Sequence, residues 1–211
     1  MKCSEAMSST QGKKKVGIMG GTFNPIHNGH LALANKAYDD LSLDHVLFVP
    51  SGKSYMKKHV LSTEKRVEMV KRAITPFPYF ELSLIEINRL GNTYTCDTLQ
   101  LLTNRNKNIH YYFILGADSL FQIASWKDPE LIFSMATIVC AVRDEYDMNA
   151  IKSKGEELEK LGADIIYLDM PKIDISSSEI RLRVKNKLPY SELVPDSVSK
   201  FIQQEHLYEE D

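Results

Sequence analysis

The segment KVGIMGGTFNPIHNGHLALANKAYDDL, residues 15–41, contains the first passage from an apolar run to a helical pattern in the chain. Residues 15–20 are short and apolar, as in a buried strand, and residues 30–41 repeat apolar side chains at the spacing of one helix face. The helix-face residues are Leu31, Ala34, Tyr38 and Leu41. A glycine pair, a proline and two histidines lie between the two runs, so the segment predicts the strand, loop and helix of a βαβ unit.

The same alternation continues to the C-terminus. Further strands are expected at 45–50, 80–87, 109–116, 136–142 and 163–170. Further helices are expected at 62–74, 93–105, 128–135, 147–162, 176–186 and 195–207. Strands that alternate with helices indicate a parallel sheet, and nearly continuous apolar strands indicate that both of its faces are covered. The expected class is therefore α/β, a Rossmann-like doubly wound parallel sheet with helices on both faces.

Composition and length narrow the class of protein. The 211 residues are 43% apolar and carry a net charge of −2, so no overall basic field indicates nucleic-acid binding. Cys3, Cys96 and Cys140 form no C-x-x-C pair, which favours a reducing, cytoplasmic setting. No apolar run approaches the length of a membrane span. We expect a disordered leader or tag remnant over residues 1–14 and one domain over 15–211.

The loop after the first strand has the features of an anion site. Gly20 and Gly21 allow a sharp turn and close approach of a ligand to the backbone, and a helix N-terminus follows near Asn28. The loop matches neither G-x-G-x-x-G nor the P-loop, for which position 47 is Leu where Gly is needed. A phosphate group is the ligand that this backbone favours.

Three interpretations of His27 and His30 remain open from the residues alone. They could be zinc ligands, although a third ligand of suitable type is not nearby. They could be loop histidines without a functional role. They could also donate hydrogen bonds to phosphate oxygens, and their position beside the glycine loop favours this interpretation.

A second candidate anion site lies in DISSSEIRLR near the C-terminus. Ser176 and Glu179 have the spacing of a capping box, with Ser176 as N-cap. Ser177 and Ser178 then fall in the first helical turn, where their N–H and hydroxyl groups could bind an anion. Arg181 lies one turn further on and could add a charged donor. The alternative is simply a well-capped surface helix.

The two segments together resemble one superfamily. GGTFNPIHNGH resembles the T/H-x-G-H signature of the nucleotidyltransferases, and ISSSEIR resembles their I-S-S-T-x-I-R signature, with Ser178 in place of Thr. The resemblance implies transfer of a nucleotidyl group from a nucleoside triphosphate with release of pyrophosphate. It also implies that His27 and His30 contact the triphosphate and stabilise the transition state.

Further segments resemble the bacterial nicotinate mononucleotide adenylyltransferases. These are NTYTCDTL at 92–99, LGADSLFQIASWKDPELI at 115–132 and VPSGKSYMKK at 49–58. The likeness runs from about Lys15 to Leu207. Two departures stand out, because Asn24 replaces the more usual Asp and Ser54-Tyr55-Met56 replace Pro-Pro-His.

The resemblance assigns roles residue by residue. Residues implied in catalysis are His27, His30, Lys57 and Arg181. Residues implied in ATP binding are Gly20, Gly21, Thr22, Phe23, His27, His30, Asp118, Ser177, Ser178 and Arg181. Residues implied in mononucleotide binding are Lys57, Thr93, Tyr94 and Trp126. Trp126, the sole tryptophan, could equally be a core residue, and Asp118 could equally be a helix cap.

The expected reaction joins nicotinate mononucleotide to the AMP part of ATP. The implied cofactor is Mg²⁺, carried with ATP, and no protein metal site, nucleic acid or membrane partner is expected. The same chemistry on nicotinamide mononucleotide or phosphopantetheine remains an alternative, as does a non-catalytic nucleotide-binding regulator. Homo-oligomerisation is left open by the sequence.

Overall fold

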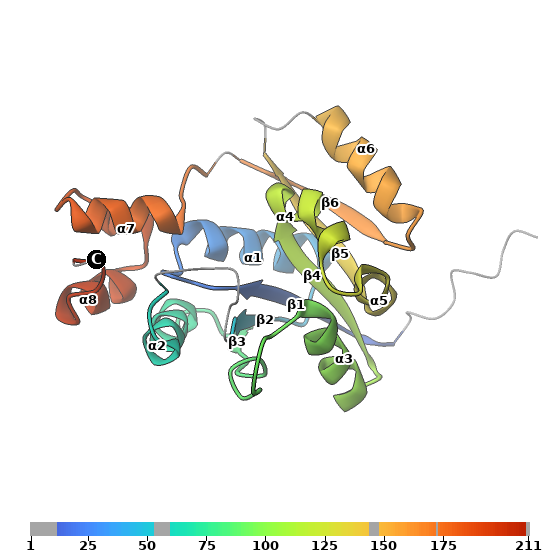
Figure 1. The fold of residues 1–211 in the computed structure, drawn as a ribbon, viewed down its shortest axis with the longest axis horizontal. Coiled ribbons are helices and arrows are strands. Elements are labelled where there is room, and N and C mark those ends of the chain that lie inside the picture. The colour runs from blue at the N-terminus through green and yellow to red at the C-terminus, as the bar shows by residue number, and fades with distance from the viewer. Residues whose placement is uncertain (1–11, 53–59, 144–147, 172, 210–211) are drawn as a thin grey trace, which may run out of the picture.

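A single parallel sheet forms the centre of the molecule in the computed structural model, which describes residues 12–52, 60–143, 148–171 and 173–209 (Figure 1). The strands are β1 (Lys14–Gly21), β2 (His45–Pro50), β3 (Phe80–Leu82), β4 (Ile109–Gly116), β5 (Ala136–Arg143) and β6 (Ile165–Met170). Their order across the sheet is β3-β2-β1-β4-β5-β6, and each neighbouring pair is parallel. The expected doubly wound class is confirmed.

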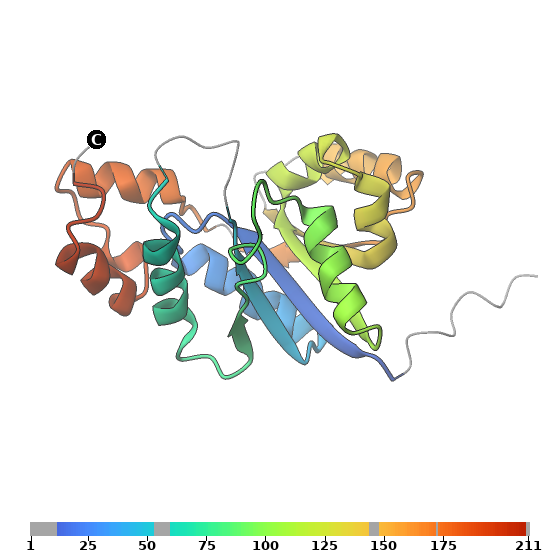
Figure 2. The ribbon, with the colours of Figure 1, turned by 60° about the horizontal axis from the view of Figure 1, so that its bottom comes forward.

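Helices cover both faces of this sheet (Figure 2). They are α1 (Asn28–Leu41), α2 (Thr63–Ile74), α3 (Thr95–Arg105), α4 (Ala117–Gln122), α5 (Pro129–Met135), α6 (Met148–Glu159), α7 (Ser177–Lys185) and α8 (Asp196–Gln204). One core contains residues of α1, α2, α7 and α8, and the other contains residues of α3, α4, α5 and α6. Among the described helices, none is long and apolar enough to cross a membrane.

Most expected elements begin and end within two residues of the observed ones, but the expected strand at 80–87 is wrong. Only Phe80–Leu82 is strand, because β3 pairs with β2 over three residues and the chain then turns. The backbone N–H of Asn88 donates to the Leu84 carbonyl, and the Leu84 side chain is exposed. The apolar letters of this segment therefore belong partly to a surface turn.

Three short elements were not expected, namely α4 and the 3₁₀ turns at Ile123–Ser125 and Ser191–Leu193. Each is too short for a helical period to show in the sequence. At the N-terminus, β1 begins at Lys14, one residue before the expected domain start, and its N–H donates to the Asn108 carbonyl. The expected leader lies almost wholly outside the described residues, and its disorder stays a prediction.

The chain reverses its direction of winding between β1 and β4. From β1 the order runs outward through β2 to β3, and from β4 it runs outward through β5 to β6. In open parallel sheets, ligands bind beyond the carboxyl ends of the strands at such a switch point. The loops after Gly21 and Gly116 are therefore the segments in which to seek a site.

Candidate active site

The loop after β1 leads directly into α1 through the two histidines. His27 is the N-cap of α1, and its backbone N–H donates to Nδ1 of His30 at 3.3 Å. The two rings lie 3.7 Å apart between centroids. Because Nδ1 of His30 accepts this bond, the proton of the neutral ring is on Nε2. The loop thus holds His30 as a donor of fixed tautomer.

The two sequence motifs meet in space, through residue pairs that are 152 and 157 positions apart in the chain. The Arg181 guanidinium donates to the Asn24 carbonyl at 2.8 Å, and the Ser177 hydroxyl donates to the Pro25 carbonyl at 2.8 Å. Both donors lie on α7, which Figure 1 shows beside the C-terminal end of β1. The glycine loop and the serine-rich helix start therefore form one site, as the resemblance implied.

The first turn of α7 differs from expectation in one respect. Ser176 accepts from the Glu179 N–H at 3.1 Å, so the predicted cap is confirmed. The single hydrogen of the Ser177 hydroxyl is used on the loop, however, and Ser178 Oγ accepts from Arg181 at 3.2 Å. A phosphate contact of Ser177 would in this arrangement come from its backbone N–H. The expectation of a free hydroxyl donor is corrected for Ser177 only, because Ser178 accepts a hydrogen bond and keeps its own hydroxyl hydrogen.

The Asn24 side chain points into the protein rather than toward a phosphate. Asn24 is only 5% exposed, and its Oδ1 accepts from the Leu61 N–H at 3.3 Å and the Tyr208 hydroxyl at 3.0 Å. Burial raises the pKa of Tyr208, so the phenol keeps its proton and acts as donor. The departure from the more usual Asp thus falls on a side chain that holds the loop in place.

The backbone of this loop is strained at Phe23. Phe23 has φ of 50°, in the left-handed region that favours glycine, and its ring is buried against Phe48 and His30. A Cβ at Gly21 would lie 3.0 Å from the Phe23 ring, which explains the glycine at that position. Non-glycine residues persist in such a conformation only where the surroundings over-determine it, and they cluster at functional sites.

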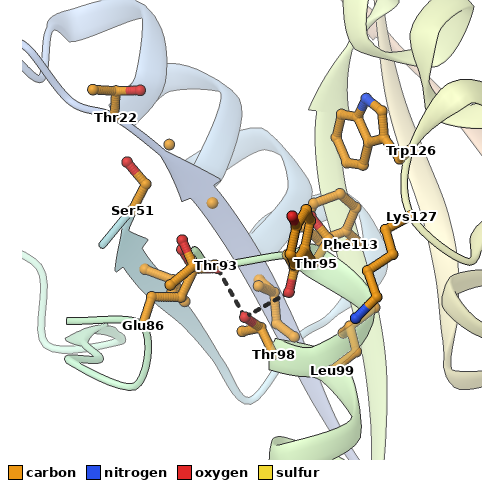
Figure 3. A pocket seen from close by; sticks show the side chains of 15 residues that line it. Thr22, Ser51, Glu86, Thr93, Thr95, Thr98, Leu99, Phe113, Trp126 and Lys127 are labelled. Atoms are coloured by element: carbon orange, nitrogen blue, oxygen red, sulfur yellow. Dashed lines mark hydrogen bonds between the residues drawn. The ribbon is translucent and has the colours of Figure 1, made fainter. Parts of the chain in front are cut away.

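A cavity of about 250 Å³ opens beside the loop at the carboxyl ends of β1, β2 and β4 (Figure 3). Its lining includes the following residues with a sequence-predicted role: Gly20, Gly21, Thr22, Thr93, Tyr94 and Trp126. In Figure 3, Thr22 and Ser51 lie on one side, while Phe113 and Trp126 lie on the other. The cavity therefore joins the expected phosphate loop to the expected ring-binding residues.

Trp126 serves both the core and the cavity. Its ring is half-buried and meets Phe113 edge-on, with centroids 6.2 Å apart and planes at 80°. The same ring lines the cavity, where a flat heteroaromatic ring could stack on it. The two interpretations of this residue are thus compatible.

A cluster of charged side chains next to Trp126 was not expected from the sequence. Lys127 Nζ lies 3.0 Å from Asp97 Oδ1 and 4.9 Å from the centre of the Tyr94 ring. Arg89 donates to the other oxygen of Asp97 at 3.0 Å. This charged cluster links the loop before α3, the start of α3 and the loop that contains Trp126. In the sequence, the position of Lys127 next to the sole tryptophan was the feature that could have indicated this cluster.

Glu86 was also not expected at the site, because the sequence predicts a strand over residues 80–87. It lines the cavity, and the Thr98 hydroxyl donates to its Oε1 at 2.8 Å (Figure 3). The Glu86 carboxylate thereby brings a negative charge to a cavity wall that is otherwise mainly hydroxyl and apolar.

Several predicted site residues that the structure describes do not line this cavity, namely Phe23, His27, His30, Asp118, Ser177, Ser178 and Arg181. Asp118 is exposed and is the second residue of α4, whose N-cap is Gly116, so the helix-cap alternative for Asp118 is wrong. Lys57 and the neighbouring Ser54-Tyr55-Met56 lie outside the described residues, and the role of Lys57 stays a prediction. Across the described ranges, no group of three His, Cys, Asp or Glu side chains could hold a metal ion.

Comparison with known proteins gives consistent matches. Residues 18–183 match the cytidylyltransferase-like family model. A protein of Lachnoclostridium phytofermentans named "Probable nicotinate-nucleotide adenylyltransferase" is 42% identical over 90% of this chain and 96% of its own length. One of the same name from Corynebacterium kroppenstedtii is 40% identical over 96% of this chain and 94% of its own.

Solved structures share the fold. The nicotinic acid mononucleotide adenylyltransferase of Plasmodium falciparum complexed with NaAD superposes with a TM-score of 0.77. The match covers 94% of this chain and 98% of the other, at 21% identity. A second structure of that enzyme, complexed with APC, gives the same TM-score at 20% identity.

Proposed function

The chain belongs to the nicotinate-nucleotide adenylyltransferase family of cytidylyltransferase-like nucleotidyltransferases, and we propose that it transfers AMP from ATP to nicotinate mononucleotide. The products are nicotinate adenine dinucleotide and pyrophosphate, so the reaction belongs to NAD biosynthesis. The observation that carries this proposal is the contact of Arg181 and Ser177 with the loop that holds His27 and His30, beside a cavity that ends at Trp126.

The proposed chemistry needs no general base. A phosphate oxygen of the mononucleotide, already anionic at neutral pH, forms a bond to the α-phosphorus of ATP. The bond from that phosphorus to the bridging oxygen of the β-phosphate breaks, and pyrophosphate leaves with the electron pair. Catalysis then consists of positioning and charge stabilisation by preorganised donors.

The site residues divide this work. His30 donates from Nε2, the tautomer set by the backbone N–H of His27. Arg181 reaches the same loop from α7 and adds positive charge there, and Lys57 would add a further cation. The nicotinate ring would stack on Trp126, with its carboxylate near the backbone N–H groups of Thr93 and Tyr94 at the N-terminal end of α3.

Mg²⁺ is proposed to arrive as part of the ATP substrate. The described side chains offer no cluster that would form a protein cage for the ion. Mg²⁺ commonly keeps several waters and binds substrate phosphates, which fits such a site. No step of the mechanism above depends on a protein-held metal.

Pyrophosphate release tests the proposal. ATP and Mg²⁺ are supplied with nicotinate mononucleotide, nicotinamide mononucleotide or phosphopantetheine, and initial rates are compared. The proposal expects the highest kcat/KM with the acid. A higher kcat/KM with the amide would overturn the choice of substrate, and no release with any acceptor would favour a nucleotide-binding regulator.

The buried, free Cys96 and Cys140 are consistent with action in the reducing cytoplasm.

A further inference from the structure

Arg66 carries a buried positive charge directly behind the loop of the site. It lies on α2 and is only 2% exposed. Burial lowers the pKa of its guanidinium, but an arginine begins so high that it stays charged at neutral pH. A charge this deep is costly unless hydrogen bonds and a favourable field compensate for it.

The guanidinium donates its hydrogen bonds to neutral oxygens of three segments around the site. Nη1 donates to the Thr22 carbonyl at 2.9 Å, and Nη2 donates to the Ser51 carbonyl at 2.9 Å. Nε donates to the Leu61 carbonyl at 3.2 Å, and Nη2 also reaches the Thr63 hydroxyl at 3.3 Å. The loop after β1, the end of β2 and the start of α2 thus share one anchor.

The bond to Thr22 fixes the direction of the next N–H. A trans peptide is planar, so its carbonyl oxygen and its N–H point in opposite directions. The Thr22 carbonyl points toward the buried Arg66, and the N–H of Phe23 therefore points the opposite way, away from Arg66. Thr22 itself lines the cavity. Phe23 is also the residue with strained backbone, which needs such an anchor to persist.

We propose that Arg66 is a positioning residue for adenylyl transfer, which orients the Thr22–Phe23 peptide toward the substrate phosphates and supplies a buried positive charge beneath them. The anionic substrate offsets a charge whose four protein acceptors are all neutral. This inference rests on the proposed function for its choice of substrate, but its anion-binding part can be tested without any acceptor.

The variants are Arg66→Met and Arg66→Lys, with Arg72→Met as a matched control. Arg72 lies on the same helix but pairs with Glu68 at 2.7 Å and stacks on Phe201, away from the loop. Arg66→Lys keeps the charge, but one ammonium group cannot reproduce the planar fork that reaches the Thr22 and Ser51 carbonyls together. The lysine variant therefore separates charge from orientation.

Two measurements are made on full-length protein whose fold is checked by circular dichroism. The first is pyrophosphate release, with kcat and the KM of each substrate determined separately. We expect Arg66→Met to lower kcat about 100-fold while the KM of the mononucleotide changes less than about 2-fold. Arg66→Lys should restore only a minor part of kcat, and Arg72→Met should match the parent.

The second measurement is the affinity for inorganic tripolyphosphate by calorimetry, which needs neither ATP turnover nor an acceptor. We expect about 10-fold weaker binding in Arg66→Met and near-parental binding in Arg66→Lys, since the lysine keeps the charge. If the parent releases no pyrophosphate, the proposed function fails, while this affinity still decides the role of Arg66.

The proposal is overturned if folded Arg66→Met keeps parental kcat and tripolyphosphate affinity. It is equally overturned if kcat is retained and the variant only unfolds at a lower temperature, because that result describes a purely structural residue. Should Arg66→Met fail to fold, Arg66→Lys decides alone, by whether kcat falls while the KM of the mononucleotide and tripolyphosphate affinity hold.

Discussion

The two ends of the sheet use side-chain hydrogen bonds in different ways. At the amino end, His110 Nε2 lies 2.9 Å from the Thr137 hydroxyl, which donates to Asp164 at 2.8 Å. His110 and Thr137 are the second residues of β4 and β5, and Asp164 directly precedes β6, so the network joins neighbouring strands to one another. At the carboxyl end, Arg66 on α2, Arg181 on α7 and Tyr208 in the turn after α8 instead bind a single loop.

The difference lies in what each network leaves open. The amino-end network joins side chains of adjacent strands, and such closure stabilises the sheet. The carboxyl-end donors bind backbone and side-chain oxygens of the loop from behind, which leaves the front of the loop facing a cavity. In a fold of this type, residues that stabilise the sheet lie at the amino ends of its strands, and residues that form the site lie at the carboxyl ends.

Removing His30, at the carboxyl end of the sheet, should lower turnover more than any other change considered below. We expect His30→Ala to lower kcat about 100-fold or more with little change in the KM of the mononucleotide, because a preorganised donor acts mainly in the transition state. Pyrophosphate release measures it. The control at the amino end is His110→Ala, which should keep parental turnover, and a His30→Ala variant with normal kcat would defeat the assignment.

Trp126 provides the next test, at the far end of the cavity. Trp126→Ala should raise the KM of nicotinate mononucleotide about 10-fold and leave kcat near parental, since stacking binds ground and transition states alike. In the parent, the single tryptophan should report mononucleotide binding by a change in its fluorescence. A change of kcat without a change of KM would place the ring at the reacting atoms instead.

The Tyr208 bond to Asn24 sharpens the structural half of the carboxyl end. Tyr208→Phe removes a donor to a buried acceptor and should reduce the free energy of unfolding by about 1 kcal/mol. Denaturant unfolding gives that value, and kinetics should show only a small loss of kcat. A loss of kcat as large as that of His30→Ala would mean that Asn24 acts on the substrate rather than on the loop.

The smallest expected effect is the pH dependence of stability from His110. Burial, with Lys13 and Lys15 nearby, lowers the pKa of His110 in the folded protein, although Asp164 acts the other way. The unfolded imidazole binds a proton more readily, so the stability contributed by His110 is complete above its usual pKa of about 6.5 and is lost as pH falls through the lower folded value. His110→Gln should flatten the unfolding free energy between about pH 7 and pH 5. An unchanged profile would contradict this assignment.

Sequence patterns predicted the elements best where burial is periodic. The limits of β2 and β4 agree residue for residue with expectation, because their apolar runs end at turn residues. The pattern failed at residues 83–87, where apolar letters lie in a turn and Leu84 is exposed. It also passed over Arg66, which in the sequence resembles any other cation on an amphipathic helix.

The features of the candidate site likewise fall into those that the sequence predicts and those that only the tertiary structure decides. The sequence alone determined which residue types and which order the site requires, namely the glycine loop with His27 and His30, and the capped helix start with Arg181. These depend on local backbone geometry and capping, which spacing along the chain encodes. Only the tertiary structure decided which donors face a ligand and which hold the loop. Ser177 and Arg66 donate to carbonyl oxygens of the loop, and Asn24 Oδ1 accepts from the Leu61 N–H and the Tyr208 hydroxyl. The winding of the sheet brings these partners together, and no local pattern encodes a partner 37 to 184 residues away.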